Sequence, residues 1–258
     1  MEKLLKKYDL SKVEITKIKK NSKIKSTEDF KNRIKELSEC LALSDDEIKK
    51  ILIKYPTILT YSTEMIMKKQ KEYINTLGFS TEEFKTLIVR SPETISYGIQ
   101  AILNKGKFLS EKIGTGKKEF KRIILKFPGI LKHNNESLNK KINLYLNNKI
   151  EKDEIIHNPT MFTLSTSTFI TRLAICKFFR ISIKTFLNKK FYMENENKLY
   201  SNLMYLKEKN VVFSRYNIVA RKLPKSNKIY SLHPFDKTAK KVVFYSAEVY
   251  DENGNEIE

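Results

Sequence analysis

The chain has 258 residues, and 40% of them are apolar, which allows a substantial core and excludes wholesale disorder. The 50 Lys and Arg outnumber the 30 Asp and Glu, so the net charge is +20. This excess favours a polyanionic partner, nucleic acid first and an anionic membrane surface second. The alternative is that lysine is simply the usual surface residue of an AT-rich genome.

Cysteine and histidine are too sparse to suggest disulfides or a metal site. The two cysteines have no paired spacing, and the three histidines lie far apart, so neither a disulfide framework nor a metal centre is predicted. No uncharged apolar run reaches about 18 residues, so no membrane span is expected. We expect a cytoplasmic protein without a cofactor or a small-molecule substrate.

Residues 1–25 are polar and rich in lysine, and they predict a basic N-terminal arm or a cap. The segment lacks an apolar signal core. It also contains Glu2, Asp9 and Glu14, which argues against an organelle transit peptide. This is the pattern expected of a bacterial-type chain.

A phrase then recurs at a spacing of 36 residues: IKKILIKYPTIL at 48–59, FKTLIVRSPETI at 84–95 and FKRIILKFPGIL at 120–131. Each copy is preceded by a helix-capping pattern, Ser-x-x-Glu in the first two and Gly-x-x-Glu in the third. The proline ends the helix, because it excludes the preceding residue from the α conformation. The first copy places apolar side chains on one helical face at Ile48, Ile51, Leu52 and Tyr55. A second buried side is predicted at Ile53, Val89 and Leu125.

A second helix is predicted after each proline turn. Its start is marked by Ser62, Gly98 or Asn134, and Gly78 or Gly114 marks its end, since glycine suits the left-handed position after a helix. The repeating unit is therefore helix, proline turn, helix.

The same register extends in both directions. Ser26 begins a half-unit before the first full one, and Pro159 follows Pro128 by 31 residues. Ser182 and Ser214 mark two degraded starts further along. This pattern predicts an all-α protein, an α-solenoid over residues 26–224; an irregular helical bundle is the alternative. Residues 225–258 change character and predict a C-terminal extension, a β-hairpin with an acidic end.

Basic residues recur at equivalent repeat positions. The first basic column lies seven residues after the second-helix caps and consists of Arg33, Lys69, Lys105, Lys141 and Arg172. The second basic column lies two and six residues before the prolines and consists of Lys50, Lys54, Arg90, Arg122 and Lys126. We predict that both contact phosphates. The alternatives are a solvated face for the first column and salt bridges along the helix for the second.

The units resemble those of the mTERF family, the mitochondrial transcription termination factors. The resemblance rests on a Leu-Gly-x-Ser start, an acidic and apolar helix, and a proline followed by apolar residues. One unit carries it at Leu77, Gly78, Ser80, Glu83, Phe84, Leu87, Ile88, Pro92 and Ile95.

The resemblance implies a left-handed superhelix of helical triplets, in which the third helix is the short turn after the proline. It also implies duplex DNA, and sometimes RNA, held in a basic groove by Arg and Lys of the inner helices, which would be the two columns. Family roles include transcription termination, organelle gene expression and ribosome assembly. The short array and the missing transit peptide set this chain apart from organelle members.

Competing functions have less support. The stretch GTGKK at 114–118 evokes a phosphate-binding loop, but the required first glycine falls at Glu111 and Lys118 occupies the Ser/Thr position. No catalytic carboxylate pair or nucleophile–histidine spacing occurs, so no enzyme is expected. We predict a monomeric duplex-binding protein that acts in transcription regulation or termination. A protein- or ribosome-binding scaffold is the alternative.

Overall fold

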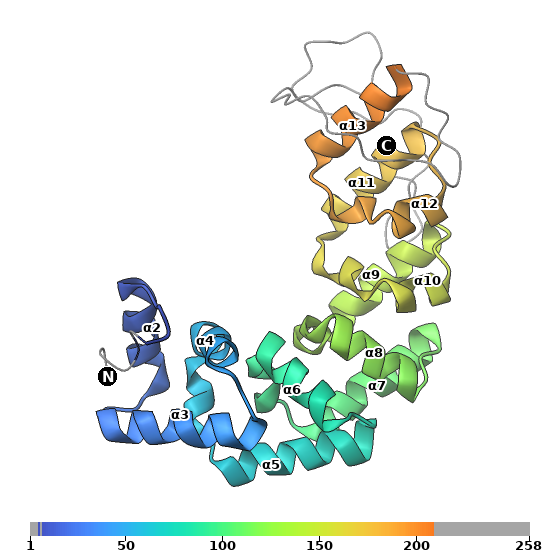
Figure 1. Cartoon of the computed structure of the whole chain (residues 1–258). Helices are drawn as coiled ribbons and strands as arrows, with labels where there is room; N and C mark the ends of the chain where they lie inside the picture. The colour runs from blue at the N-terminus through green and yellow to red at the C-terminus, as the bar shows by residue number, and fades with distance from the viewer. Residues whose placement is uncertain (1–4, 6, 209–258) are drawn as a thin grey trace. The chain divides into compact units, whose positions relative to one another are not determined.

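The computed structural model describes residue 5 and residues 7–208. These residues form α-helices, short 3-10 helices and one π-helical turn, and there is no strand among them (Figure 1). The prediction of an all-α fold is confirmed for this part of the chain. The predicted start at Ser214 and the C-terminal extension at 225–258 lie outside the described residues.

The repeating unit is an α-helix, a five-residue 3-10 helix that begins at the proline, and a second α-helix. The first full unit contains α4 (Asp45–Lys54), η1 (Pro56–Thr60) and α5 (Thr63–Glu72), which continues into the π-helical η2 (Tyr73–Leu77). The next contains α6 (Thr81–Arg90), η3 (Pro92–Ser96) and α7 (Ile99–Ile113). The third contains α8 (Lys117–Lys126), η4 (Pro128–Lys132) and α9 (Asn135–Asn147).

Partial and shorter units flank these three. On the N-terminal side lie α2 (Lys12–Ser22) and α3 (Thr27–Leu41). On the C-terminal side lie α10 (Lys152–His157), η5 (Pro159–Thr163) and α11 (Thr166–Phe178), then α12 (Ile183–Asn188), η6 (Phe191–Met193) and α13 (Glu196–Glu208). The predicted proline turn at Pro159 and the cap at Ser182 are both present.

The predicted boundary signals act as expected. Ser44 and Ser80 each form a complete capping box with a glutamate, whereas Gly116 begins α8 without a side-chain cap. Gly78 and Gly114 end the second helices at φ values of +73° and +76°. Ala42, at the same repeat position, also adopts a left-handed conformation, with φ +49°.

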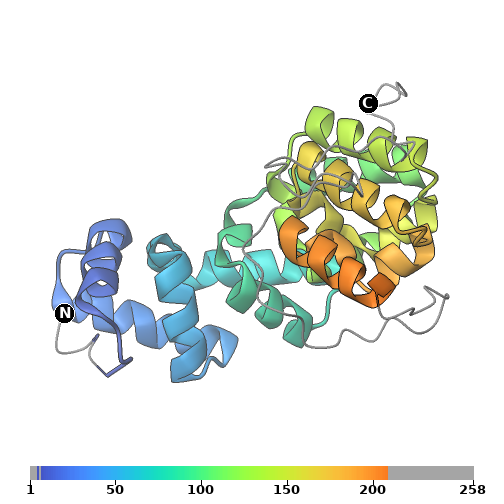
Figure 2. The same cartoon turned by 90° about the horizontal axis from the view of Figure 1, so that it is seen from above.

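The described residues fall into two compact units. The first comprises Met1–Glu111 and Thr115–Lys132, and the second comprises Lys112–Gly114 and the residues from His133 onward. In the first unit, helices of the same kind pack side by side: α2 with α4, α4 with α6, and α3 with α5 (Figures 1 and 2). In the second unit, α9 contacts α10, and α11 contacts α13 and η6.

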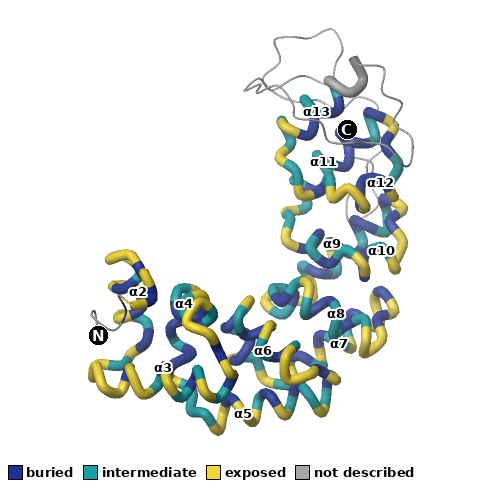
Figure 3. The backbone as a smooth tube through the Cα atoms, in the orientation of Figure 1, coloured by how far each residue is buried: buried dark blue, intermediate teal, exposed yellow. Residues whose placement is uncertain are grey.

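The apolar face predicted from the repeat forms the core, except that its fourth residue, Tyr55, is only half-buried. Ile48, Ile51 and Leu52 of α4 are at most 1% exposed, and the matching residues of α6 and α8 are also buried (Figure 3). The second side predicted at Ile53, Val89 and Leu125 is only half-buried.

Helix α2 occupies the segment for which we predicted an arm or a cap. Ser11 and Glu14 form a capping box at its start, and the helix packs against α4 and η1. This box stands 33 residues before the one at Ser44, not 36, which explains why the strict period overlooks it. We refer to α2 as the cap helix, because it precedes the regular repeats.

Candidate nucleic-acid interface

Most of the first basic column bonds to the protein's own backbone. Lys69 Nζ donates to the carbonyl of Tyr97 at 2.9 Å, Lys141 Nζ donates to that of Phe162 at 2.7 Å, and Arg172 Nη1 donates to that of Tyr192 at 2.6 Å. Tyr97 directly follows η3, while Phe162 and Tyr192 lie within η5 and η6. These cations therefore neutralise the carbonyl ends of the short 3-10 helices.

Burial separates the members of this column further. Lys105 and Lys141 are only 9% and 8% exposed, and burial lowers the pKa of both ammonium groups. The Arg172 side chain is 12% exposed and also pairs with Glu196 at 2.9 Å. Arg33 differs, because its side chain is 39% exposed and its guanidinium bonds to Glu36 at 2.8 Å. The column is thus turned into the fold at every position except the first.

The second basic column is largely exposed, and two of its members form a ladder between repeats. Lys54 Nζ donates to the carbonyl of Arg90 at 2.8 Å, and the Arg90 guanidinium donates to the carbonyls of Leu125 and Lys126. Each cation thus meets the C-terminal carbonyls of the equivalent helix in the next repeat, where positive charge is favourable. Lys50, Lys54, Arg90 and Lys126 are exposed, and Arg122 is half-buried with no partner for its Nε.

A third series of lysines connects each repeat to the preceding one. Lys85 pairs with Glu47 at 3.2 Å, and Lys121 pairs with Glu83 at 2.9 Å. The same lysines donate to the carbonyls of Ala42 and Gly78, which end the preceding second helices. Hydrogen bonds from the Ser44 and Ser80 backbone, supported by the lysines, hold the pKa of Glu47 and Glu83 below the ordinary value.

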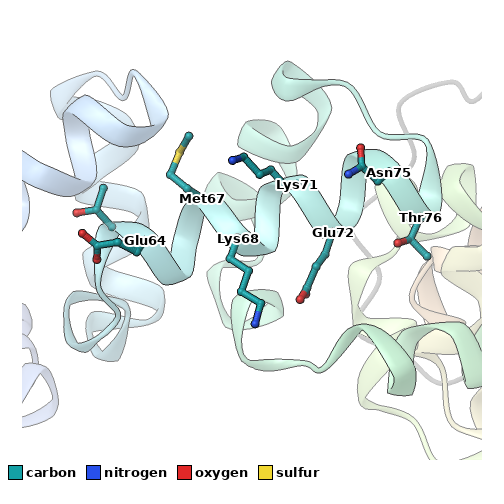
Figure 4. A pocket seen from close by; sticks show the side chains of 8 residues that line it. Glu64, Met67, Lys68, Lys71, Glu72, Asn75 and Thr76 are labelled. Atoms are coloured by element: carbon teal, nitrogen blue, oxygen red, sulfur yellow. The ribbon is translucent and has the colours of Figure 1, made fainter.

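The described residues offer little for small-molecule or metal chemistry. They contain no group of three His, Cys, Asp or Glu placed to hold a metal ion. A depression of about 710 Å³ runs along α5 and η2, lined by Thr63, Glu64, Met67, Lys68, Lys71, Glu72, Asn75 and Thr76 (Figure 4). Its charges are mixed in sign, and its walls come from a single helical segment, so it lacks the enclosure of a substrate site.

None of the helices in the described part of the chain combines the length and the apolar character needed to cross a membrane.

Comparison with known proteins gives one family. The model of the mTERF family matches residues 4–199, which run from before α2 into the start of α13. No curated protein matches the chain. The matched segment begins ahead of residue 26, where the strict repeat began, and so includes the cap helix α2.

Proposed function

The chain belongs to the mTERF family, and on this basis we propose that it is a non-enzymatic helical-repeat protein that binds nucleic acid. The favoured ligand is duplex DNA, with structured RNA second, and the process is regulation or termination of transcription in the cytoplasm. The observation that carries the proposal is the family match over most of the described helices, together with the net charge of +20.

The exposed second basic column supplies the phosphate contacts in this proposal. Lys54 and Arg90 are held in position by the ladder, so little side-chain entropy is lost when a phosphate approaches. Lys50 lies one turn before Lys54 on α4 and is exposed. Such contacts bind without reading sequence, because they reach the backbone and not the base edges.

We propose a structural role for the buried members of the first basic column. Lys69, Lys141 and Arg172 donate to carbonyls, and none of them is exposed, whereas Lys54 and Arg90 are exposed beside their carbonyl bonds. Charge reversal at Lys69, Lys105 and Lys141 would consequently report on folding as much as on binding.

A titration tests the function directly. Random-sequence duplex DNA, duplex RNA and single strands are titrated with the full chain at two salt concentrations. Micromolar or tighter duplex binding that weakens steeply with salt supports the proposal. A lack of duplex binding at low salt contradicts it.

A paired variant tests the assignment of the second basic column. Lys50→Gln with Lys54→Gln is expected to lower the slope of log affinity against log salt by about 2. The control is Lys31→Gln with Lys35→Gln on α3, which also removes two exposed lysines. Equal slopes for both pairs would contradict the assignment.

A protein- or ribosome-binding scaffold is the second candidate, favoured by one observation. Met65 and Met67 of α5 are 52% and 38% exposed, and Met67 lines the depression of Figure 4. Exposed methionines are typical of adaptable protein-binding surfaces. Met65→Ser with Met67→Ser leaves nucleic-acid binding unchanged if this surface has a separate partner.

A further inference from the structure

Lysine is concentrated at the N-terminal cap of the first unit. Between residues 11 and 25 the chain has six lysines, all exposed: Lys12, Lys17, Lys19, Lys20, Lys23 and Lys25. The one acid in this stretch, Glu14, bonds to the backbone and hydroxyl of Ser11. These bonds lower the pKa of Glu14, so it is ionised but already engaged at the helix start.

The equivalent helices of the next two repeats are different. Helix α4 begins with Asp45, Asp46 and Glu47, and α6 begins with Thr81, Glu82 and Glu83. Their acids offset their lysines and arginines, whereas α2 and α8 each carry an excess of basic residues.

A polar cavity adjoins these lysines where α2 turns into α3. It measures about 610 Å³ and is lined by Lys23, Ile24, Lys25, Ser26, Asp29, Asn32, Arg33, Glu36, Leu59 and Thr60. Three segments build it: the connection between α2 and α3, the first turns of α3, and η1. Thr57 of η1 donates to the carbonyl of Asn21 at 3.3 Å, which ties the proline turn to the end of α2.

The backbone conformation and the acidic residues around this cavity determine which basic groups face it. Lys23 adopts φ +58°, which ends α2 and turns the chain so that Lys23 and Lys25 both line the cavity. Glu36 accepts a hydrogen bond from Arg33, which fixes the guanidinium and leaves other N–H donors of its fork available. Asp29 is exposed at the first turn of α3.

We propose that Lys23, Lys25 and Arg33 form a second phosphate-binding site, the N-terminal basic corner, which holds the sugar-phosphate backbone of a nucleic acid. The inference rests on the proposed function and extends it. Arg33 of the first basic column lines this cavity, whereas Lys69, Lys141 and Arg172 donate to carbonyls at the short 3-10 helices. Lys17 and Lys20, on the exposed face of α2, add to the attraction of a polyanion.

Neutralisation of the two lysines tests the corner. In the full chain, Lys23→Gln with Lys25→Gln is expected to weaken random-sequence duplex binding about tenfold near 0.1 M salt. The slope of log affinity against log salt should fall by about 2. Circular dichroism should be unchanged, because both side chains are exposed and bond to no helix.

The matched control again removes two lysines close by. Lys31 and Lys35 lie about 100–160° around α3 from Asp29, Arg33 and Glu36, and neither lines the cavity. Lys31→Gln with Lys35→Gln should therefore keep the wild-type slope. Arg33→Lys, which retains the charge but loses the planar fork, should weaken binding less than Arg33→Gln.

Two failures of this experiment are distinct. If the wild-type chain binds duplexes with a steep salt slope and the Lys23→Gln, Lys25→Gln variant keeps that slope, the N-terminal basic corner is not a phosphate-binding site. The proposed function then still stands. If the wild-type chain binds no duplex at low salt, the proposed function fails and the corner with it.

Discussion

The regular repeats between residues 44 and 132 and the divergent repeats after them are stabilised by different interactions. In the regular part, partly exposed charges connect one repeat to the next: Lys54 and Arg90 bond to the following helix end, and Lys85 and Lys121 pair with the preceding capping box. In the divergent part, His157 takes the position of Arg90. Its Nδ1 contacts the carbonyl of Asp153 in its own helix, at 2.6 Å.

Buried aromatic rings are prominent in the divergent part. The ring of Phe169 lies 4.6 Å from that of Tyr145 and 5.6 Å from that of Phe186, and all three residues are at most 1% exposed. Two contacts are common to both parts. Tyr73 donates to the carbonyl of Thr94, and Tyr145 donates to that of Met161. The first basic column also donates to carbonyls at the short 3-10 helices in both, through Lys69, Lys141 and Arg172. The comparison indicates that these contacts preserve the fold, while the exposed charged connections between repeats are replaceable.

The largest expected effect comes from the aromatic cluster. Phe169→Ala should destabilise the chain by about 3–5 kcal/mol, because a fully buried ring is lost and leaves a cavity. Ile66→Ala, at the same repeat position in α5, should cost less, about 2–4 kcal/mol, since the side chain is smaller. Urea unfolding measures both. A smaller loss at Phe169 than at Ile66 would contradict the aromatic-core account.

The next largest effect on stability should distinguish a buried lysine, Lys141, from an exposed one, Lys50. Lys141→Gln removes a buried charged hydrogen bond to the Phe162 carbonyl and should cost about 1.5–3 kcal/mol. Lys50→Gln changes an exposed side chain and should cost less than about 0.5 kcal/mol. Thermal unfolding distinguishes them. Equal stability of the two variants would mean that the first basic column does not support the fold.

The fold was predictable from sequence to the extent that its signals are local. Ser44, Pro56 and Gly78 each act on backbone conformation within a few residues, so their positions alone place the helix ends. The orientation of the basic columns was not predictable in the same way. Whether Lys54 reaches solvent or the Arg90 carbonyl depends on how two repeats stack, and periodicity carries no information about that stacking.

An arm or a cap was predicted at residues 1–25, but the helix α2 within it was not, for a related reason. Its capping box at Ser11 is intact, but it stands outside the 36-residue spacing, and the lysines around it hide the amphipathic pattern of Ile15 and Ile18. A search for capping boxes without a fixed period would have found it. The cavity at Lys23 and Lys25 could not have been found, because η1 contributes one of its walls.

A smaller effect is expected where helices end in the left-handed conformation. Ala42, Gly78 and Gly114 share one repeat position, and a side chain at positive φ is disfavoured by about 1 kcal/mol. Ala42→Gly should therefore stabilise the chain, and Gly78→Ala should destabilise it by a similar amount. A Cβ at Gly78 would meet only Lys117 Cε at 3.8 Å, so the backbone and not a clash determines the loss. Stability changes of the same sign in both variants would contradict this.

The smallest effect concerns the glutamate three residues after the helix cap, which is Glu83 in the regular part and Glu154 in the divergent part. The two residues should affect the free energy of unfolding in opposite directions as pH changes. Glu83 has a lowered pKa, chiefly from the Ser80 backbone bond, so its contribution is present at neutral pH and is lost as pH falls below about 4.5. Burial, followed by repulsion from Glu151, raises the pKa of Glu154, whose Oε2 has no hydrogen-bond partner. Ionised Glu154 therefore weakens the fold as pH rises above about 4.5.

Glu83→Gln and Glu154→Gln test this difference within one chain. At pH 7 the first should lose less than about 1 kcal/mol and the second should gain a comparable amount, since both effects arise at partly solvated groups. Urea unfolding at pH 7 and at pH 4 measures them, and the gap between the two variants should narrow at the lower pH. If Glu83→Gln instead stabilised the chain at pH 7, the desolvation cost of the Glu83–Lys121 ion pair would exceed the free energy that the pair contributes. The stability of the regular repeats would then come from their apolar core, as it does in the divergent repeats.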